Sequence, residues 1–277
     1  MSLHVESLGD GPPLLMIHGW GMHGGMWGDA AGRLAQDFRV LMVDLPGHGL
    51  SGNSGVGSRK SEVEKGNGFF CSPLPTPHSP IDDIVDQLSA QFSEPLTLCG
   101  WSLGGQVALC WALREPEKVR RLILVASTPC FVRRPDWACA MAAETLMQFS
   151  VALQQDYAQT LRRFLALQVR GSENERVLLA GLREALFDRG EPDMGALQSG
   201  LEILRDCDLR GALPEVKQPV LVIAGERDTL TPLQAAQYMA AQMPDARLIT
   251  IKGAAHAPFL SRPEIFVERI REFLKSE

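Results

Sequence analysis

Residues 95–115 read PLTLCGWSLGGQVALCWALRE, an apolar run and a helical pattern joined at a glycine-rich turn. The apolar run at 95–100 predicts a buried strand, and residues 102–115 predict the helix that follows it. Between them Gly100, Ser102 and Gly104 fit the pattern G-x-S-x-G, which places a serine on a sharp turn from strand to helix. At a helix start, backbone N–H groups and the helix dipole favour developing negative charge. We therefore predict that Ser102 is a nucleophile, and a serine that only caps the helix is the alternative.

Apolar runs alternate with helical patterns on both sides of this turn. Strands are predicted at 12–19, 38–44, 119–127, 219–225 and 246–253, and helices at 25–36, 233–243 and 263–274. Continuous apolar strands that alternate with helices are typical of a parallel sheet covered on both faces. We therefore predict an α/β fold with a mostly parallel sheet and helices on both faces.

Two stretches interrupt this alternation. Residues 131–205 are helical in pattern without strand signals, which predicts a helical cap inserted into a core formed by residues 1–130 and 206–277. Residues 51–80 are rich in Gly, Ser and Pro and lack periodicity, which predicts a long, mobile surface loop.

Composition limits the classes of partner. The net charge of −6 argues against a general binder of nucleic acid or anionic membranes. No apolar run approaches the ~18 residues of a transmembrane helix, and the first residues lack a signal-peptide pattern. The six cysteines form no C-x-x-C pair and no metal-ligand spacing with histidine, so we interpret them as reduced thiols. We expect a cytoplasmic monomer that binds no nucleic acid, no membrane, no metal and no cofactor.

A serine hydroxyl is a weak nucleophile without a base, and in this arrangement its partners follow it along the chain in the order Ser, acid, His. Asp228 follows the predicted strand at 219–225, and His256 follows the strand at 246–253. Active sites of open α/β sheets lie at these carboxyl ends of the strands. We predict that His256 is the general base and that Asp228 orients it, with Glu226 as the alternative acid.

The oxyanion hole of such a site needs two backbone donors. One is predicted to be the N–H of Leu103, directly after the nucleophile, and the other the N–H of Trp20 in the loop HGWGMHGGMW at 18–27. We interpret His18 as a structural side chain that braces this loop. The glycine-rich turn DLPGHGLSG at 44–52 is also predicted to be structural.

With HGWG, DLPGHG, GWSLGG, GERD and GAAHAPF in this order, the chain resembles the α/β-hydrolase superfamily. The stretches HGWGM (18–22), VASTPCF (125–131), RFLALQ (163–168) and GLEILRDCDLR (200–210) resemble, more closely, the pimeloyl-acyl-carrier-protein methyl ester esterases of biotin synthesis. The resemblance implies an α/β-hydrolase fold with a helical cap. It also implies a serine carboxylesterase that releases methanol from its substrate, with an acyl-carrier protein as partner.

The resemblance further implies which residues contact the substrate. These are Trp20, Ser102, Leu103, Phe164, Leu165, Ala166, Leu167, Gln168 and His256. For residues 164–168, a helix that packs its apolar side into the core is the alternative. Arg163 and Arg176 match two carrier-docking positions of the family, whereas Gln159 and Ala180 replace basic residues at two others. An ordinary solvated helix face is the alternative for each arginine.

The catalytic pattern does not fix the substrate, because one fold serves many reactions. A broad short-chain esterase and a C–C bond hydrolase remain alternatives within the enzymes. A non-catalytic ligand-binding protein is the alternative from another class.

Overall fold

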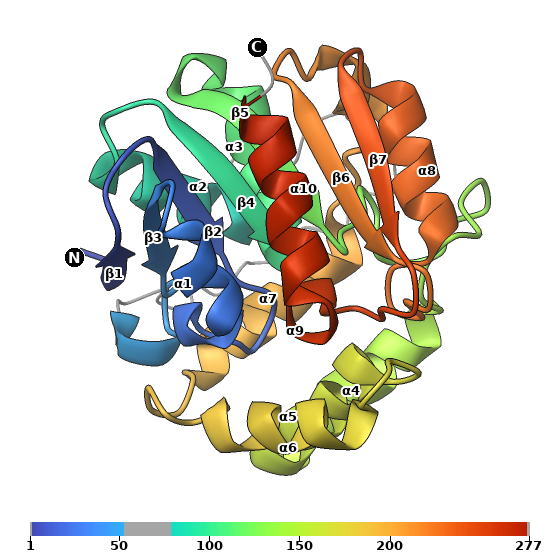
Figure 1. Cartoon of the computed structure of the whole chain (residues 1–277). Helices are drawn as coiled ribbons and strands as arrows, with labels where there is room; N and C mark the ends of the chain where they lie inside the picture. The colour runs from blue at the N-terminus through green and yellow to red at the C-terminus, as the bar shows by residue number, and fades with distance from the viewer. Residues whose placement is uncertain (1, 53–78, 276–277) are drawn as a thin grey trace.

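The computed structural model describes residues 2–52 and 79–275. Its sheet has seven strands in the order β1-β3-β2-β4-β5-β6-β7 (Figure 1). The strands are β1 Val5–Leu8, β2 Pro13–Ile17, β3 Arg39–Val43, β4 Leu96–Trp101, β5 Val119–Val125, β6 Val220–Gly225 and β7 Ala246–Ile251. In this described part of the chain, β1 pairs antiparallel with β3 and the other neighbouring strands run parallel. The predicted mostly parallel sheet is confirmed.

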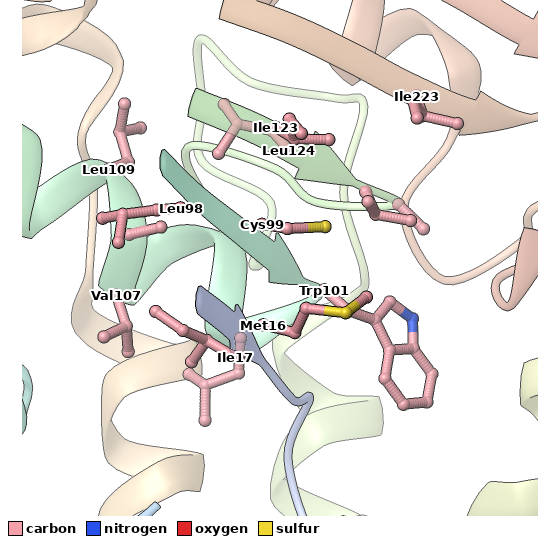
Figure 2. Close-up of a cluster of buried hydrophobic side chains, with 14 of the residues drawn as sticks. Met16, Ile17, Leu98, Cys99, Trp101, Val107, Leu109, Ile123, Leu124 and Ile223 are labelled. Carbon is pink, nitrogen blue, oxygen red and sulfur yellow. The ribbon is translucent and has the colours of Figure 1, made fainter. Parts of the chain in front are cut away.

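The centre of the sheet is buried on both faces, which explains why its strands are continuous apolar runs rather than alternating ones. In β4, Leu98 points toward Val107 and Leu109 of the following helix, whereas Cys99 points to the opposite face (Figure 2). All four side chains are at most 1% exposed. The strand that leads to Ser102 is therefore fixed by apolar packing on both sides.

Helices cover both faces of this sheet (Figure 1). On one face α1 Asp29–Leu34 packs against α10 Pro263–Lys275, and on the other α2 Pro80–Gln91 packs against α3 Leu103–Arg114. The helix α8 Leu233–Gln242 packs on β6 and β7, and the short helix α9 Pro258–Ser261 precedes α10. The described part of the core also contains the short 3-10 helices η1 Gly24–Trp27, η2 Gly49–Ser51, η3 Pro116–Lys118 and η4 Arg210–Glu215.

Between β5 and β6 the chain leaves the sheet and forms four helices, which we call the α4–α7 insertion. They are α4 Ala143–Gln155, α5 Tyr157–Val169, α6 Glu175–Ala185 and α7 Met194–Asp206. Figure 1 shows α4, α5 and α6 beyond the carboxyl ends of the strands. Helices α4 and α5 are separate because Asp156 between them is extended, and its side chain accepts a hydrogen bond from Gln159 N. The insertion therefore lies at the edge of the sheet where the active site is expected.

Neither β1 nor α2 was predicted from the sequence. The edge strand β1 is short and only half-buried, so its pattern is weak. Helix α2 begins at Pro80, directly after the stretch predicted as a loop, and Ser79 and Asp82 form a capping box at its start. Most of the loop predicted at 51–80 lies outside the described residues. In the described ranges no helix is long and apolar enough to cross a membrane.

Candidate active site

Ser102 lies at the turn from β4 to α3, and its backbone is in the left-handed region, with φ 56° and ψ −117°. A non-glycine residue there costs roughly 1–2 kcal/mol, so the surrounding contacts must hold it in place. Ser102 N donates to Val125 O at 3.0 Å, and Ser127 Oγ donates to Ser102 O at 2.9 Å. These two contacts tie both backbone polar groups of Ser102 to the end of β5.

The glycines of the motif let the strand and the helix approach each other closely. A Cβ added to Gly100 would lie 2.2 Å from Gly104 O, and one added to Gly104 would lie 2.2 Å from Ile17 O. Both distances are far below van der Waals contact, and the clashing atoms are backbone atoms that cannot move aside. Larger residues would push α3 away from β2 and β4 and so displace Ser102.

Asp228 and His256 meet at the carboxyl ends of β6 and β7. Nδ1 of His256 lies 2.7 Å from Oδ2 of Asp228, and both side chains are at most 1% exposed. Because a carboxylate can only accept a hydrogen bond, Nδ1 carries the proton and donates it in this contact, and the other ring nitrogen, Nε2, carries the lone pair. Within residues 2–52 and 79–275, Nε2 is buried and has no hydrogen-bond partner. It is therefore free to accept a proton.

Three further donors hold the Asp228 carboxylate. Leu230 N and Thr231 N donate to Oδ1 at 2.8 and 3.0 Å, and Thr231 Oγ1 donates to Oδ2 at 2.6 Å. Thr231 Oγ1 also lies 3.3 Å from Nδ1 of His256. Thr231 was missed in the sequence, although an aspartate that accepts hydrogen bonds from the backbone two or three residues later is a common turn.

Glu226, the alternative acid, makes a different contact. Its Oε2 accepts a hydrogen bond from Gly253 N at 2.9 Å, and the residue is exposed. The geometry therefore pairs His256 with Asp228 rather than with Glu226.

The two ends of the predicted triad are linked through the residue before the nucleophile. Trp101 Nε1 donates to His256 O at 2.8 Å, and the two rings lie 6.1 Å apart. Although this brings the His256 loop (residues 253–259) against the turn, no hydrogen bond joins Ser102 Oγ to Nε2 of His256. Such catalytic hydrogen bonds often form only when substrate is bound.

The loop at residues 18–24, here called the Trp20 loop, packs directly on the turn. A Cβ added to Gly19 would lie 3.2 Å from Cβ of Ser102, so the next residue, Trp20, lies beside the nucleophile. Neither Trp20 N nor Leu103 N donates to a hydrogen bond with a described residue. Both N–H groups are thus available for the role predicted for them.

His18 braces this loop. Its Nδ1 donates to Gly19 O at 2.8 Å, and its Nε2 accepts from Leu45 N at 2.9 Å, so the ring is neutral and uses both nitrogens. Burial, together with the neighbouring His48, lowers the pKa of His18 to about 3. Its contacts agree with a structural side chain and leave no nitrogen for a proton transfer.

An apolar wall from the insertion covers the Trp20 loop. The rings of Trp20 and Phe164 meet edge to face at 5.1 Å, and Phe149 packs on both at 5.8 and 5.6 Å. Trp20 Nε1 also donates to Leu197 O of α7 at 2.9 Å. Of the segment predicted to bind substrate, Phe164 is thus the member that lies against Trp20.

The other residues of the segment 164–168 differ in how deeply they are buried. Leu165 and Gln168 are buried, whereas Ala166 and Leu167 are half-buried. Gln168 reaches the His256 loop, because its carbonyl accepts a hydrogen bond from Ala257 N at 3.2 Å. Leu165 is fully buried in the main apolar core, as expected for a residue that packs rather than binds.

Arg163 and Arg176, predicted to dock the carrier, lie on α5 and α6 and are both exposed. No cluster of three or more His, Cys, Asp or Glu side chains that could hold a metal ion occurs among the described residues.

Residues 14–269 match the alpha/beta hydrolase family. The chain belongs to this family. It is similar to the pimeloyl-[acyl-carrier protein] methyl ester esterase of Nitrosomonas europaea, with 46% identity over 266 residues that cover 96% of this chain and 97% of that protein. The enzyme of the same name from Chromobacterium violaceum is 39% identical over 277 residues, the whole of both chains. The resemblance drawn from the motifs is confirmed.

Solved structures agree on the fold. An esterase from Exiguobacterium antarcticum superimposes with a TM-score of 0.81 at 25% identity, covering 99% of this chain and 96% of that one. An enol-lactonase from Burkholderia xenovorans gives a TM-score of 0.78 at 22% identity over 99% and 96% of the two chains, which shows the shared fold alone. The predicted α/β-hydrolase fold is thus confirmed.

Proposed function

We propose that this protein is a serine carboxylesterase that hydrolyses the methyl ester of pimeloyl-[acyl-carrier protein] and releases methanol, a step of biotin synthesis. The chemistry rests on one observation: His256, bound to Asp228 at 2.7 Å, keeps Nε2 free beside the strained Ser102 turn. The substrate is supported by relatives of this name at 39–46% identity, whose likeness covers 96–100% of this chain.

The reaction begins when Ser102 Oγ attacks the ester carbonyl and its proton passes to Nε2 of His256. Trp20 N–H and Leu103 N–H stabilise the negative oxygen of the tetrahedral intermediate. As the bond to the methoxy group breaks, His256 returns the proton and methanol leaves. Water then attacks the acyl-serine with His256 again as base, which releases the carboxylate and restores Ser102.

The acyl chain of the substrate is apolar and needs an apolar channel. We place this channel between the Trp20 loop and the insertion, where Trp20, Phe149 and Phe164 form a cluster of rings. Residues 131–205 then act as a cap over Ser102, which is only 8% exposed. The half-buried Ala166 and Leu167 follow Phe164 on the same helix and would extend the channel toward His256.

The proposal is tested with Ser102→Ala, which should lower kcat at least about 10⁴-fold while substrate still binds. Ser150→Ala, which removes a half-buried hydroxyl from α4, is the matched control and should keep full activity. Full turnover in the Ser102 variant would refute the chemistry.

The substrate is tested by comparing kcat/KM for the carrier-bound ester with that for a simple p-nitrophenyl ester. Equal values would favour a broad short-chain esterase, and cleavage of a C–C bond would favour the other alternative. Growth without biotin of a bacterium that lacks its own esterase, restored by this gene, would support the pathway.

We further propose that an acyl-carrier protein docks on Arg163 and Arg176, because carrier proteins are acidic and both arginines are exposed on the insertion. Arg163→Glu should raise KM for the carrier-bound ester and leave KM for a small ester unchanged. The control is Arg120→Glu. Arg120 is exposed at the amino end of β5, whereas the insertion follows the carboxyl end of that strand. Equal losses on both esters would refute docking at Arg163.

A cytoplasmic location and a monomeric state complete the proposal. The location is supported by the five described cysteines, which are all free thiols. Gel filtration with light scattering would test the monomer.

A further inference from the structure

The segment 168–175, from the last turn of α5 to the first residue of α6 and here called the α5–α6 turn, touches both loops that carry the proposed acid and base. Two contacts reach the His256 loop: Ala257 N donates to Gln168 O at 3.2 Å, and Ala255 N donates to Ser172 Oγ at 3.2 Å. These two donors are the backbone N–H groups on either side of His256. The turn thus holds the main chain at the residue before and the residue after the base.

A third contact reaches the loop that carries Asp228. Arg227 Nη1 donates to Gly171 O at 2.7 Å, and the aliphatic part of the Arg227 side chain lies close to Gly171. An exposed ion pair between Glu173 and Arg262, at 2.5 Å, closes the outer side of the turn. Loops after β6 and after β7 are therefore joined through a segment of the insertion.

The turn itself is internally fixed. Gly171 has a φ of 82°, and its N–H donates to Glu175 Oε2 at 2.8 Å, while Ser172 N donates to Val169 O at 2.9 Å. Ser172 is 9% exposed, so its Oγ is presented to Ala255 N with little competition from water. A rigid acceptor of this kind restricts the position of the main chain at His256.

We propose that the α5–α6 turn is a positioning element for His256, with Ser172 and Arg227 as its positioning residues. The inference rests on the proposed function, because it assigns the turn to the base of that reaction. The core alone leaves both N–H groups that flank the base without these acceptors, so the insertion supplies alignment of the base as well as substrate contacts. The turn also joins the two helices that carry Arg163 and Arg176.

The decisive variant is Ser172→Ala, assayed with a small p-nitrophenyl ester so that carrier docking plays no part. One lost hydrogen bond predicts a fall in kcat of about five- to tenfold, with KM unchanged. Ser172→Thr keeps a hydroxyl and should restore kcat, and Ser150→Ala should leave kcat as it is. Arg227→Gln, at an exposed position, should lower kcat about two- to threefold without affecting folding.

A spectroscopic measurement separates positioning from a general loss of structure. In Ser172→Ala the proton NMR signal of His256 Nδ1–H should exchange faster with water, while the thermal unfolding midpoint shifts little. An unchanged kcat and unchanged exchange in both variants, with Ser102→Ala inactive, would overturn the positioning role and leave the proposed function standing. A fully active Ser102→Ala would instead overturn the proposed function.

Discussion

The Trp20 loop and the His256 loop flank the same serine, but they are held in place by different forces. A buried charge fixes the Trp20 loop, because Gly24 N donates to Asp44 Oδ1 at 2.6 Å and Arg189 pairs with the same carboxylate at 3.2 Å. The side chain of Asp44 is fully buried. On either side of His256, the His256 loop is held by neutral hydrogen bonds, from Ala255 N to Ser172 Oγ and from Ala257 N to Gln168 O.

The two kinds of contact should affect different properties of the protein, its stability and its activity. Breaking a buried ion pair leaves a charge without a partner in a medium of low polarity, which costs stability first. Losing a neutral hydrogen bond costs little stability and mainly loosens the geometry of a catalytic group. We therefore expect substitutions around Asp44 to lower the free energy of unfolding, and substitutions around His256 to lower the rate of the reaction.

Asp44→Asn should produce the largest effect. Burial alone would raise the pKa of Asp44, but the N–H groups of Leu50 and Gly24 and the Arg189 cation outweigh it and hold this pKa below its usual range. The charged form is therefore the one that the fold requires, and its loss should lower the free energy of unfolding by about 3 kcal/mol or more. Urea denaturation measures this loss.

The control for this variant is Asp37→Asn, which removes a surface carboxylate paired with Arg271 and Lys275. It should leave the urea midpoint nearly unchanged. A loss as small in Asp44→Asn as in this control would show that the buried charge does not anchor the Trp20 loop.

Acid should weaken the same loop. Because the pKa of His18 is about 3 in the folded protein and about 6.5 when unfolded, the unfolded chain binds a proton first as the pH falls. The contribution of neutral His18 to the free energy of unfolding is complete above pH 6.5 and is lost as the pH falls toward 3. At pH 5 the loss should be about 2 kcal/mol. Urea denaturation at pH 7.5 and pH 5 would measure it. A His18→Gln variant should show a flatter dependence, and an equal slope would contradict the prediction.

Thr231→Val tests the hydrogen bonds that support the Asp228–His256 pair, because valine has nearly the same shape as threonine but no hydroxyl. It removes the hydroxyl that donates to Asp228 Oδ2 at 2.6 Å and should lower kcat/KM about tenfold, or about 1.4 kcal/mol. The exposed Thr229→Val is the control. Full activity in Thr231→Val would show that the remaining donors hold Asp228 alone.

The catalytic candidates could be predicted because their signals are local. Ser102 lies in a five-residue motif between a strand and a helix, and Asp228 and His256 each follow an apolar strand. The choice between Asp228 and Glu226 needed the structure, since both acids lie in the same four residues and only the geometry shows which one meets His256.

The supporting residues could not be predicted in this way. Ser172 acts through a hydroxyl on Ala255, 83 positions away, and leaves no periodic pattern in the sequence. Helix α2 was missed for another reason. Its buried face consists of Ile81, Val85 and Leu88, and this spacing indicates a helix only once Pro80 is recognised as the first helical residue.

Glu173→Gln should have the smallest effect of these variants. It asks whether the exposed ion pair or the buried Ser172 contact positions His256. Glu173 and Arg262 are 54% and 31% exposed, and an exposed pair of this kind contributes about 0–1 kcal/mol. If the buried contact of Ser172 is what positions His256, removing the outer ion pair should leave kcat for a small ester within about twofold. High salt should have an equally small effect on kcat of the unaltered protein, because it screens this pair and leaves the hydrogen bonds intact. A loss in Glu173→Gln as large as that in Ser172→Ala would show that the charge on the surface, rather than the buried hydroxyl, holds the base.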